Sequence, residues 1–282
     1  MLSIVGIAPH PPIIIPEIGR GRLDEARNTV HGMKELSKRV KNVQPELIVV
    51  ITPHGQVVSN GPAIMAADQL TGNFGQFGFP DTTVEMKTDR ELIDLLVEEA
   101  SSSPVKPVLL GKQNQKNDSG KTLDHGAMVP LYYLQEAGLD LPGLHITISL
   151  DSYHDLYQFG QDVKKAIDKR GVPTAVIASG DLSHRLKPGA PAGYSPKGKE
   201  FDQQLVSLIK QNKVDDLLNM DQHLVEEAGE CGLRPIIVAL GMLAQSGFNP
   251  EIISYEGPFG VGYLVSALYP QDKIIKIPGK GV

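Results

Sequence analysis

Two histidines follow short apolar runs, and a proline directly precedes each of them. Residues 3–8 lead to Pro9-His10, and residues 47–52 lead to Pro53-His54. A run of aliphatic, β-branched residues predicts a buried strand, and open α/β sheets bind ligands at the carboxyl ends of their strands. His10 and His54 are therefore predicted to meet at one edge of a sheet as metal ligands. The alternative is that proline only ends each strand and the histidine is a tolerated loop residue.

Two more histidines lie in loop-like settings beside acidic residues. His125 follows Asp124, and His184 lies three residues after Asp181, just past the apolar run 174–178. A nearby carboxylate can fix the tautomer of an imidazole and raise its basicity, which suits a proton-transfer residue or the support of a metal. For His184 the alternative is that Asp181 or Ser183 caps a helix. The remaining histidines are expected to be structural or solvated: His31, His145, His154 and His223.

An acidic ligand is predicted at Glu256, which directly follows the apolar run 252–255 and precedes Gly-Pro. Two histidines and one carboxylate form the open-faced triad of non-haem iron(II) enzymes, which leaves positions for substrate and dioxygen. An ordinary surface turn that carries a glutamate is the alternative.

The segment 228–235 contains the single cysteine of the chain, Cys231, and it complicates this assignment. A thiolate with two imidazoles would favour zinc, whereas a lone cysteine is more often a small buried apolar residue. In the same segment Arg234 could bind an anionic substrate group or pair with Glu230.

The elements that must position these residues alternate along the chain. Apolar runs at 107–110, 144–150, 174–178 and 252–255 predict strands, and amphipathic patterns at 23–40, 89–100, 156–169, 199–211 and 233–245 predict helices. This alternation predicts a single three-layer α/β/α domain with a mostly parallel or mixed sheet over residues 1–270. Residues 71–80 and 111–120 read as long loops, and residues 271–282 as a tail or a truncated linker.

Composition excludes several classes of protein. The 282 residues carry a net charge of -6 with scattered basic residues, which disfavours a nucleic-acid partner. One cysteine excludes an intrachain disulfide, and the longest apolar stretch, 236–244, is too short to span a bilayer. A soluble cytoplasmic protein is expected. Tryptophan is absent and aromatic residues make up only 5%, so no rich stacking platform for an aromatic substrate is evident.

Five short segments in this order and spacing resemble the class III extradiol ring-cleavage dioxygenases, specifically their catalytic beta subunit, from residue 1 to about residue 269. They are Ala-Pro-His-Pro-Pro at 8–12, Thr-Pro-His-Gly at 52–55, Asp-His-Gly at 124–126, Ser-Gly-Asp-Leu-Ser-His at 179–184 and Tyr-Glu-Gly at 255–257. The resemblance implies that His10, His54 and Glu256 bind Fe(II). It also implies that His184 is the acid/base histidine and that His125 assists at the substrate and oxygen side.

Residues 229–235 and 255–263 are even more similar to the dioxygenase-related, Memo-like proteins of the AmmeMemoRadiSam system, whose longer members carry an additional C-terminal domain. That resemblance brings Cys231 into the site. Asp181 and Arg234, singled out above from their sequence settings, are further candidates for lining it. It leaves three functions open. They are an Fe(II) dioxygenase that cleaves a catechol or aminophenol with dioxygen, a metal protein of a modification or redox pathway without ring cleavage, and a zinc hydrolase with His184 as base. A homo-oligomer and a partner domain or subunit also stay open.

Overall fold

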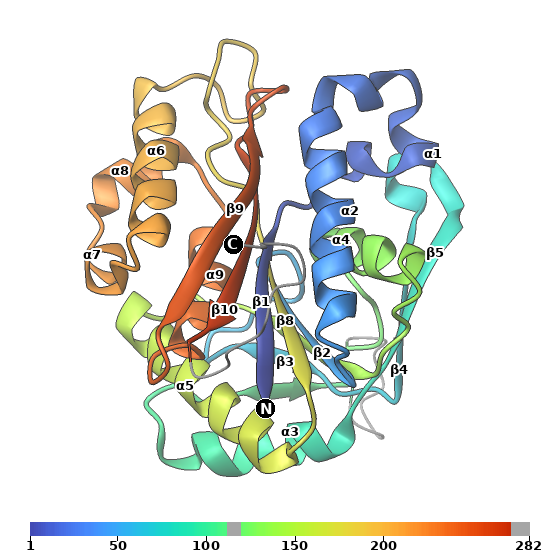
Figure 1. The fold of residues 1–282 in the computed structure, drawn as a ribbon, viewed down its shortest axis with the longest axis vertical. Coiled ribbons are helices and arrows are strands. Elements are labelled where there is room, and N and C mark those ends of the chain that lie inside the picture. Colours follow the sequence, from blue (N-terminus) through green and yellow to red (C-terminus); the bar gives the residue numbers. More distant parts are fainter. Residues whose placement is uncertain (112–119, 272–282) are drawn as a thin grey trace, which may run out of the picture.

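The computed structural model describes residues 1–111 and 120–271 (Figure 1). Its centre is an eight-stranded sheet with the spatial order β6-β3-β7-β2-β8-β1-β10-β9. The strands of this sheet are β1 (Leu2–Ala8), β2 (Leu47–Thr52), β3 (Ala63–Met65), β6 (Val108–Leu110), β7 (Gly143–Thr147), β8 (Thr174–Ser179), β9 (Phe248–Glu256) and β10 (Tyr263–Pro270).

The four central strands, β7, β2, β8 and β1, are parallel. On one side β3 pairs antiparallel with β7 and parallel with β6; on the other, β10 is antiparallel to both β1 and β9. All residues of β1, β2, β7 and β8 are buried, which explains why these strands read as continuous apolar runs. The predicted α/β domain with a mixed sheet is confirmed.

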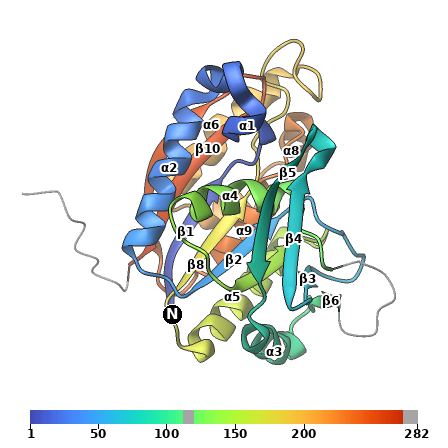
Figure 2. The same cartoon turned by 90° about the vertical axis from the view of Figure 1, so that its right-hand side faces the viewer.

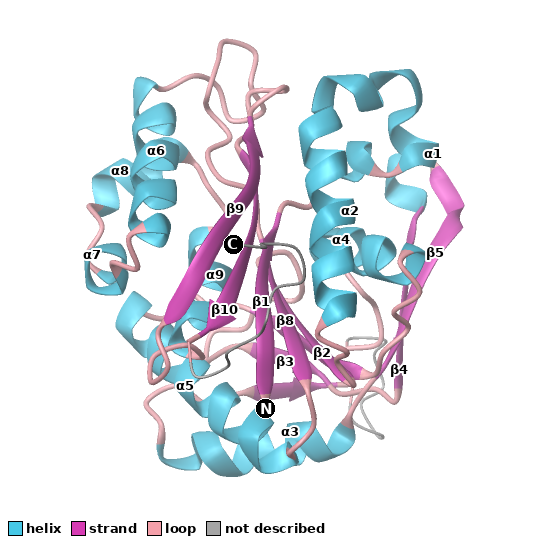
Figure 3. Ribbon diagram, viewed as in Figure 1, coloured by secondary structure: helices cyan, strands magenta, loops and turns pink. Residues whose placement is uncertain are grey.

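Helices cover both faces of the sheet, as Figure 3 shows in cyan on either side of the magenta strands. Helices α2 and α4 pack on one face, and α3, α5 and α9 on the other, where α6 also belongs to the same apolar core. The helices are α1 (Pro16–Gly19), α2 (Arg27–Asn42), α3 (Arg90–Glu99), α4 (His125–Glu136), α5 (Tyr153–Arg170), α6 (Pro196–Lys210), α7 (Val214–Leu218), α8 (Gln222–Ala228) and α9 (Leu233–Gly241), with 3-10 turns η1 (Pro12–Ile14), η2 (Arg20–Ala26), η3 (Gly75–Phe77) and η4 (Ala100–Ser102).

The prediction of a loop at residues 71–80 is wrong. Strand β4 (Gln69–Phe74), the turn η3 and strand β5 (Phe79–Lys87) form a separate two-stranded hairpin beside α4 (Figure 2). Strand β4 does alternate buried and exposed residues, but one buried position is a glycine. A Cβ at Gly72 would lie 2.5 Å from the sulfur of Met128, so the close packing of hairpin on helix requires glycine there and hides the apolar period.

Helix α4 was not predicted either, and His125 is its first residue rather than part of a loop. The helix contains Pro130 and is buried along most of its length, so its sequence lacks both an uninterrupted helix-forming pattern and an amphipathic period. Strands β3 and β10 were also missed. Among the residues described, no helix combines the length and the apolar character needed to cross a bilayer. Most of the predicted loop at 111–120 and nearly all of the tail at 271–282 lie outside the described residues.

Candidate metal centre

Three adjacent parallel strands deliver histidines to one edge of the sheet. Strands β2, β8 and β1 are neighbours, and their carboxyl ends lead into the segments that carry His54, His184 and His10 respectively. The fourth histidine, His125, comes from the first turn of α4, which packs against the ends of β2 and β8. Both Pro-His motifs therefore reach the same edge, as parallel pairing with β8 requires.

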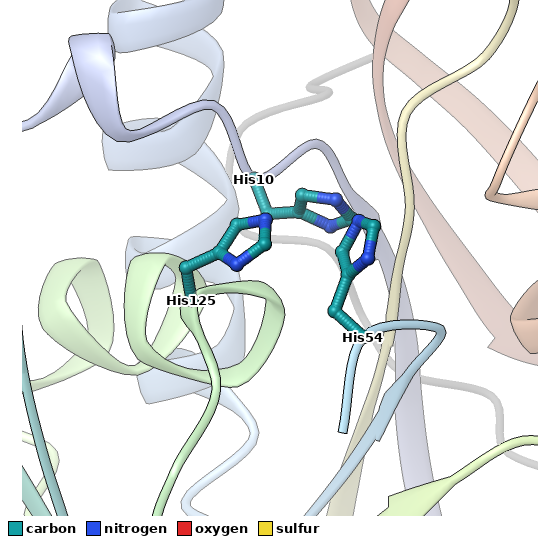
Figure 4. Close-up of side chains that lie close together, drawn as sticks. All are labelled: His10, His54 and His125. Carbon is teal, nitrogen blue, oxygen red and sulfur yellow. The ribbon is translucent and has the colours of Figure 1, made fainter. Parts of the chain in front are cut away.

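His10, His54 and His125 form a cluster in which one ring nitrogen from each residue lies within 4.8 Å of the others. Figure 4 shows the three imidazoles turned toward one another from three different segments. The ring centroids of His10 and His54 are 4.7 Å apart, those of His10 and His125 5.3 Å, and those of His54 and His125 4.4 Å. His10 is buried, His125 half-buried and His54 exposed.

The tautomer of His10 is fixed by a chain of hydrogen bonds that begins at a proline. Pro130 has no N–H, so the carbonyl of Gly126 has no intrahelical partner four residues later. The hydroxyl of Ser179 donates to that carbonyl instead, at 2.5 Å. Since its one proton is used there, the hydroxyl oxygen accepts from Nδ1 of His10, 3.0 Å away. Nε2 of His10 is left unprotonated and can bind a metal.

A second network links the chain segments that carry His54 and His125. The hydroxyl of Thr52, at the end of β2, accepts from the backbone N–H of His54 at 3.2 Å and donates to Oδ1 of Asp124 at 2.8 Å. The same Asp124 oxygen caps α4 by accepting from the backbone N–H groups of Gly126 and Ala127. One carboxylate and one hydroxyl therefore set the spacing between two cluster histidines.

The other oxygen of Asp124 lies 3.0 Å from Nε2 of His145, a fully buried residue of β7. Burial alone would raise the pKa of Asp124, but the hydrogen bonds from His145 and Thr52 outweigh it and lower the pKa far below the ordinary value. Asp124 is therefore ionised under all ordinary conditions. His145, which was expected to be structural or solvated, is buried and supports Asp124 through this hydrogen bond.

The cluster histidines are held in their neutral form. Burial and the neighbouring imidazoles lower the pKa of His10 well below its ordinary value. His54 keeps an exposed part, but the loss of hydration around its ring, together with His125 and His184, lowers its pKa to about 4. Burial also lowers the pKa of His125. Neutral imidazole is the form that binds metals, so these residues need lose no proton when a metal binds at pH 7.

His184 lies beside the cluster, near enough for its charge to lower the pKa of both His10 and His54. Its Nδ1 donates to the carbonyl of Gly229 at 2.7 Å, because a carbonyl can only accept. Nε2 of His184 is therefore a free acceptor, 3.9 Å from Oδ2 of Asp181. Burial raises the pKa of Asp181 to about 7, and its Oδ1 accepts from the backbone N–H of His10 at 2.9 Å.

The predicted lining residues divide into two groups. Sγ of Cys231 lies 3.7 Å from Nε2 of His10, and burial raises the pKa of this thiol well above its ordinary value. The Nη1 of Arg234 donates to the carbonyl of Asp151 at 2.6 Å, and its guanidinium lies over the ring of Tyr153. Cys231 and Asp181 thus border the cluster. Arg234 contacts the loop between β7 and α5 and the start of α5, and its charge also acts on the buried carboxyl of Glu230, the pairing that the sequence left open.

The carboxylate of Glu256 binds the start of α2. Oε1 accepts from the backbone N–H of Thr29 at 2.7 Å and from its hydroxyl at 2.6 Å, and Oε2 accepts from the side-chain amide of Asn28 at 3.0 Å. The N-cap residue of α2 is Ala26, which has no side-chain cap, so Glu256 serves as the cap from another element. The histidine cluster does not include Glu256, and its assignment as a metal ligand rests on the resemblance alone.

A cavity of about 810 Å³ opens on His54 and His125. Its wall is formed by the hairpin and by the segment before α4, and the turn of the hairpin places Phe77 with its ring centroid 5.7 Å from that of His125, edge to face. The cluster therefore has a large chamber next to it.

Several supporting residues escaped prediction from the sequence. Ser179 and Thr52 lie in segments that were singled out for their histidines, and Pro130 lies in a helix that was not predicted. The signal for Ser179 and Thr52 was their place at the last residue of a buried strand, where a hydroxyl needs a partner. Pro130 inside a run of apolar residues gave no comparable signal.

The residues fit a metal ion. Three neutral imidazole nitrogens converge, the tautomer of one is fixed by an outer hydrogen bond, and a thiol and a carboxyl group border the same space. Imidazole ligands suit zinc, iron and copper alike, so the donor set defines a transition-metal site without selecting among these metals.

The sequence matches, over residues 5–266, the family described as "Catalytic LigB subunit of aromatic ring-opening dioxygenase". Protein CA_C1420 of Clostridium acetobutylicum is 38% identical over 93% of this chain, which spans 56% of that longer protein. The 3,4-dihydroxyphenylacetate 2,3-dioxygenase of Escherichia coli is 25% identical over 81% of this chain and 84% of its own length. A 4,5-DOPA dioxygenase extradiol-like protein of Schizosaccharomyces pombe is 23% identical over 64% of this chain and 59% of its own length.

A solved structure, that of the uncharacterized protein JW3007 from Escherichia coli K12, has the same fold. It superposes with a TM-score of 0.61 over 94% of this chain and 99% of the other, at 15% identity. A match that covers nearly the whole chain, together with the dioxygenase names of two relatives, confirms the family resemblance read from the five motifs. The similarity to a longer protein of unnamed activity is consistent with the Memo-like placement. The chain belongs to the family of the catalytic LigB subunit of aromatic ring-opening dioxygenases.

Proposed function

We propose that this chain is a metal-dependent dioxygenase that opens the ring of a catechol or an aminophenol with dioxygen. The observation that carries the proposal is the cluster of three neutral imidazoles, which opens on a chamber large enough for such a substrate and has a free histidine base beside it. Membership of a family named for ring-opening dioxygenases supports the same reaction class.

His10, His54 and His125 would hold the metal, for which Fe(II) is our choice. When bound, the metal would supply the activation of the ring oxygens and of dioxygen that no side chain can provide. The protein keeps the three imidazoles neutral and fixes Nε2 of His10 as the free nitrogen, so the site is organised for a metal before one arrives.

His184 would take the proton from a substrate hydroxyl. Its Nδ1–H is committed to the carbonyl of Gly229, and burial lowers its pKa, so Nε2 is an unprotonated base at neutral pH. Asp181 lies 3.9 Å away, and its carboxyl, whose pKa burial raises to about 7, can stabilise in its ionised form the imidazolium that forms. Cys231 and Asp181 would shape the pocket on the side of His10.

The test is anaerobic reconstitution with Fe(II), followed by oxygen uptake on a panel of catechols and aminophenols. The proposal expects stoichiometric oxygen consumption and a ring-opened product with at least one of them. Protein loaded with Zn(II), which has no redox chemistry, is the control and should consume no oxygen. Fully iron-loaded protein that binds these compounds without consuming oxygen would refute ring cleavage.

A second candidate is a metal protein that takes part in a modification or redox pathway without ring cleavage. The observation that favours it is the thiol of Cys231 at 3.7 Å from Nε2 of His10, since a thiolate ligand shifts a site toward zinc. Under this reading Cys231→Ser changes the metal preference, and bound metal protects the thiol from alkylation. Under the dioxygenase reading Cys231→Ser leaves iron binding unchanged.

A further inference from the structure

The chamber beside the cluster is larger than a single ring requires. Its volume is about 810 Å³, and a protein cavity of roughly 150 Å³ already accommodates benzene. A catechol ring at His54 and His125 would therefore fill only a small part of the chamber. The remainder leads away from the cluster along the β4–β5 hairpin.

The wall along that remainder is one face of the hairpin. Thr71 pairs with Glu85, and Asn73 with Thr83, so these four side chains project from the same side of the two strands. All four line the chamber, together with Gln76 from the turn and Thr122 from the segment before α4. The wall thus consists of hydroxyl, amide and carboxylate groups, whereas the opposite face of the hairpin is buried against α4.

The described residues that line the chamber carry a net negative charge; Lys87 projects from the same hairpin face two residues after Glu85 but does not line the chamber. Among the described residues that line the chamber, the acidic groups are Glu85 and Asp124, and no lysine or arginine occurs. The charge of Asp124 is already taken up by His145, Thr52 and two backbone N–H groups. Within the described part of the chain, the side-chain partner of the Glu85 carboxylate is the neutral amide of Gln69 at 2.7 Å, so no described cation pairs with it.

We infer that the substrate carries a long polar extension ending in an ammonium group, which lies along the hairpin face and pairs with Glu85. This inference rests on the proposed function, because the ring at the metal end of the chamber is the catechol of that proposal. Hydroxyl and amide groups of the wall would bind the uncharged part of the extension. A catechol whose chain has the same length but ends in a carboxylate would meet repulsion at the same place.

The experiment compares matched catechols whose alkyl chains, short, medium and long, end either in an ammonium or in a carboxylate group. Dopamine and 3,4-dihydroxyphenylacetate form the short pair. Binding to the iron-loaded protein is measured anaerobically by calorimetry, and oxygen uptake is measured separately. Exchanging one charge sign for the other at roughly 6 Å from a carboxylate in water is worth about tenfold in affinity. We expect the ammonium compounds to bind about tenfold more tightly at the chain length that reaches Glu85.

Two variants locate the effect. Glu85→Gln should abolish the preference, and Glu85→Lys should invert it, while Glu98→Gln on the surface of α3 should leave it unchanged. If catechols bind but the carboxylate series binds as well as the ammonium series, or if Glu85→Gln keeps the preference, the inference is overturned and the proposed function stands. If no catechol of either series binds to the loaded protein, the proposed function itself fails, and the inference fails with it.

Discussion

Replacement of Glu256 by glutamine separates the two assignments of the third metal ligand. In the structure the Glu256 carboxylate accepts three hydrogen bonds at the start of α2 and takes the place of a missing N-cap side chain. In the assignment by resemblance the same carboxylate binds iron. The first role predicts a loss of stability at full metal content, and the second predicts a loss of metal.

The size of the stability effect follows from the three contacts. Glutamine keeps one acceptor for Thr29 but presents an amide nitrogen to Asn28, and it removes the charge that strengthens all three bonds. Because charged hydrogen bonds are about twice as strong as neutral ones, we expect the free energy of unfolding to fall by about 1–2 kcal/mol. For a domain of this size that lowers the Tm by roughly 2–8 °C.

The assay combines thermal unfolding of the metal-free protein with metal analysis after reconstitution with Fe(II). His54→Ala provides the reference for a lost ligand, and Glu98→Gln provides the control for loss of a surface carboxylate. We expect Glu256→Gln to bind as much iron as the parent protein. A Glu256→Gln protein that loses iron as completely as His54→Ala, with an unchanged Tm, would refute our reasoning and restore Glu256 as the third ligand.

Two further predictions concern the site, and a third concerns Asp202, a buried carboxyl that accepts from the backbone N–H of Ser183 at 2.8 Å and from the hydroxyl of Tyr255 at 2.7 Å. His184→Ala should lower turnover by about 10²–10⁴-fold with unchanged metal content, and parallel loss of both would make His184 a ligand instead. Ser179→Ala should weaken metal binding by about 10–100-fold in a chelator competition. Pro130→Ala should weaken it too, because its new N–H competes for the carbonyl of Gly126, while the Tm stays the same or rises. Unchanged metal affinity in both variants would contradict the assignment of the His10 tautomer. Burial raises the pKa of Asp202 to about 7, above the ordinary 3.8, so the stability that its protonated form contributes is full below pH 3.8 and is lost as the pH rises through 7. The Tm of the parent protein relative to that of Asp202→Asn should therefore fall across that pH window. A constant Tm difference would show that this carboxyl does not titrate as stated.

The sequence determined the central sheet and the edge at which chemistry is expected. Strands β1, β2, β7 and β8 are buried on both faces, so they had to be continuous apolar runs, and such runs are visible without any tertiary information. The positions of His10 and His54 after two of these runs were equally visible. Parallel strands share their carboxyl edge, so that edge could be predicted from the sequence.

Tertiary structure alone decided how the chain completes the cluster. His125 belongs to a helix that neither amphipathic period nor composition revealed, because α4 is buried along most of its length and contains Pro130. Its approach to His54 depends on Thr52 and Asp124, residues 72 positions apart in the chain. A contact of this kind depends on how a helix packs across a sheet, which no local pattern records.

The position of Glu256 shows the same limit. The residue does end a strand, β9, that runs in the same direction as β1, so its carboxylate reaches the predicted edge of the sheet. Strand β10 lies between β9 and β1, however, and two strand spacings place the end of β9 roughly 10 Å to the side, next to the start of α2. The sequence determined which residues end strands, and only the order of the strands across the sheet decided which of those residues meet.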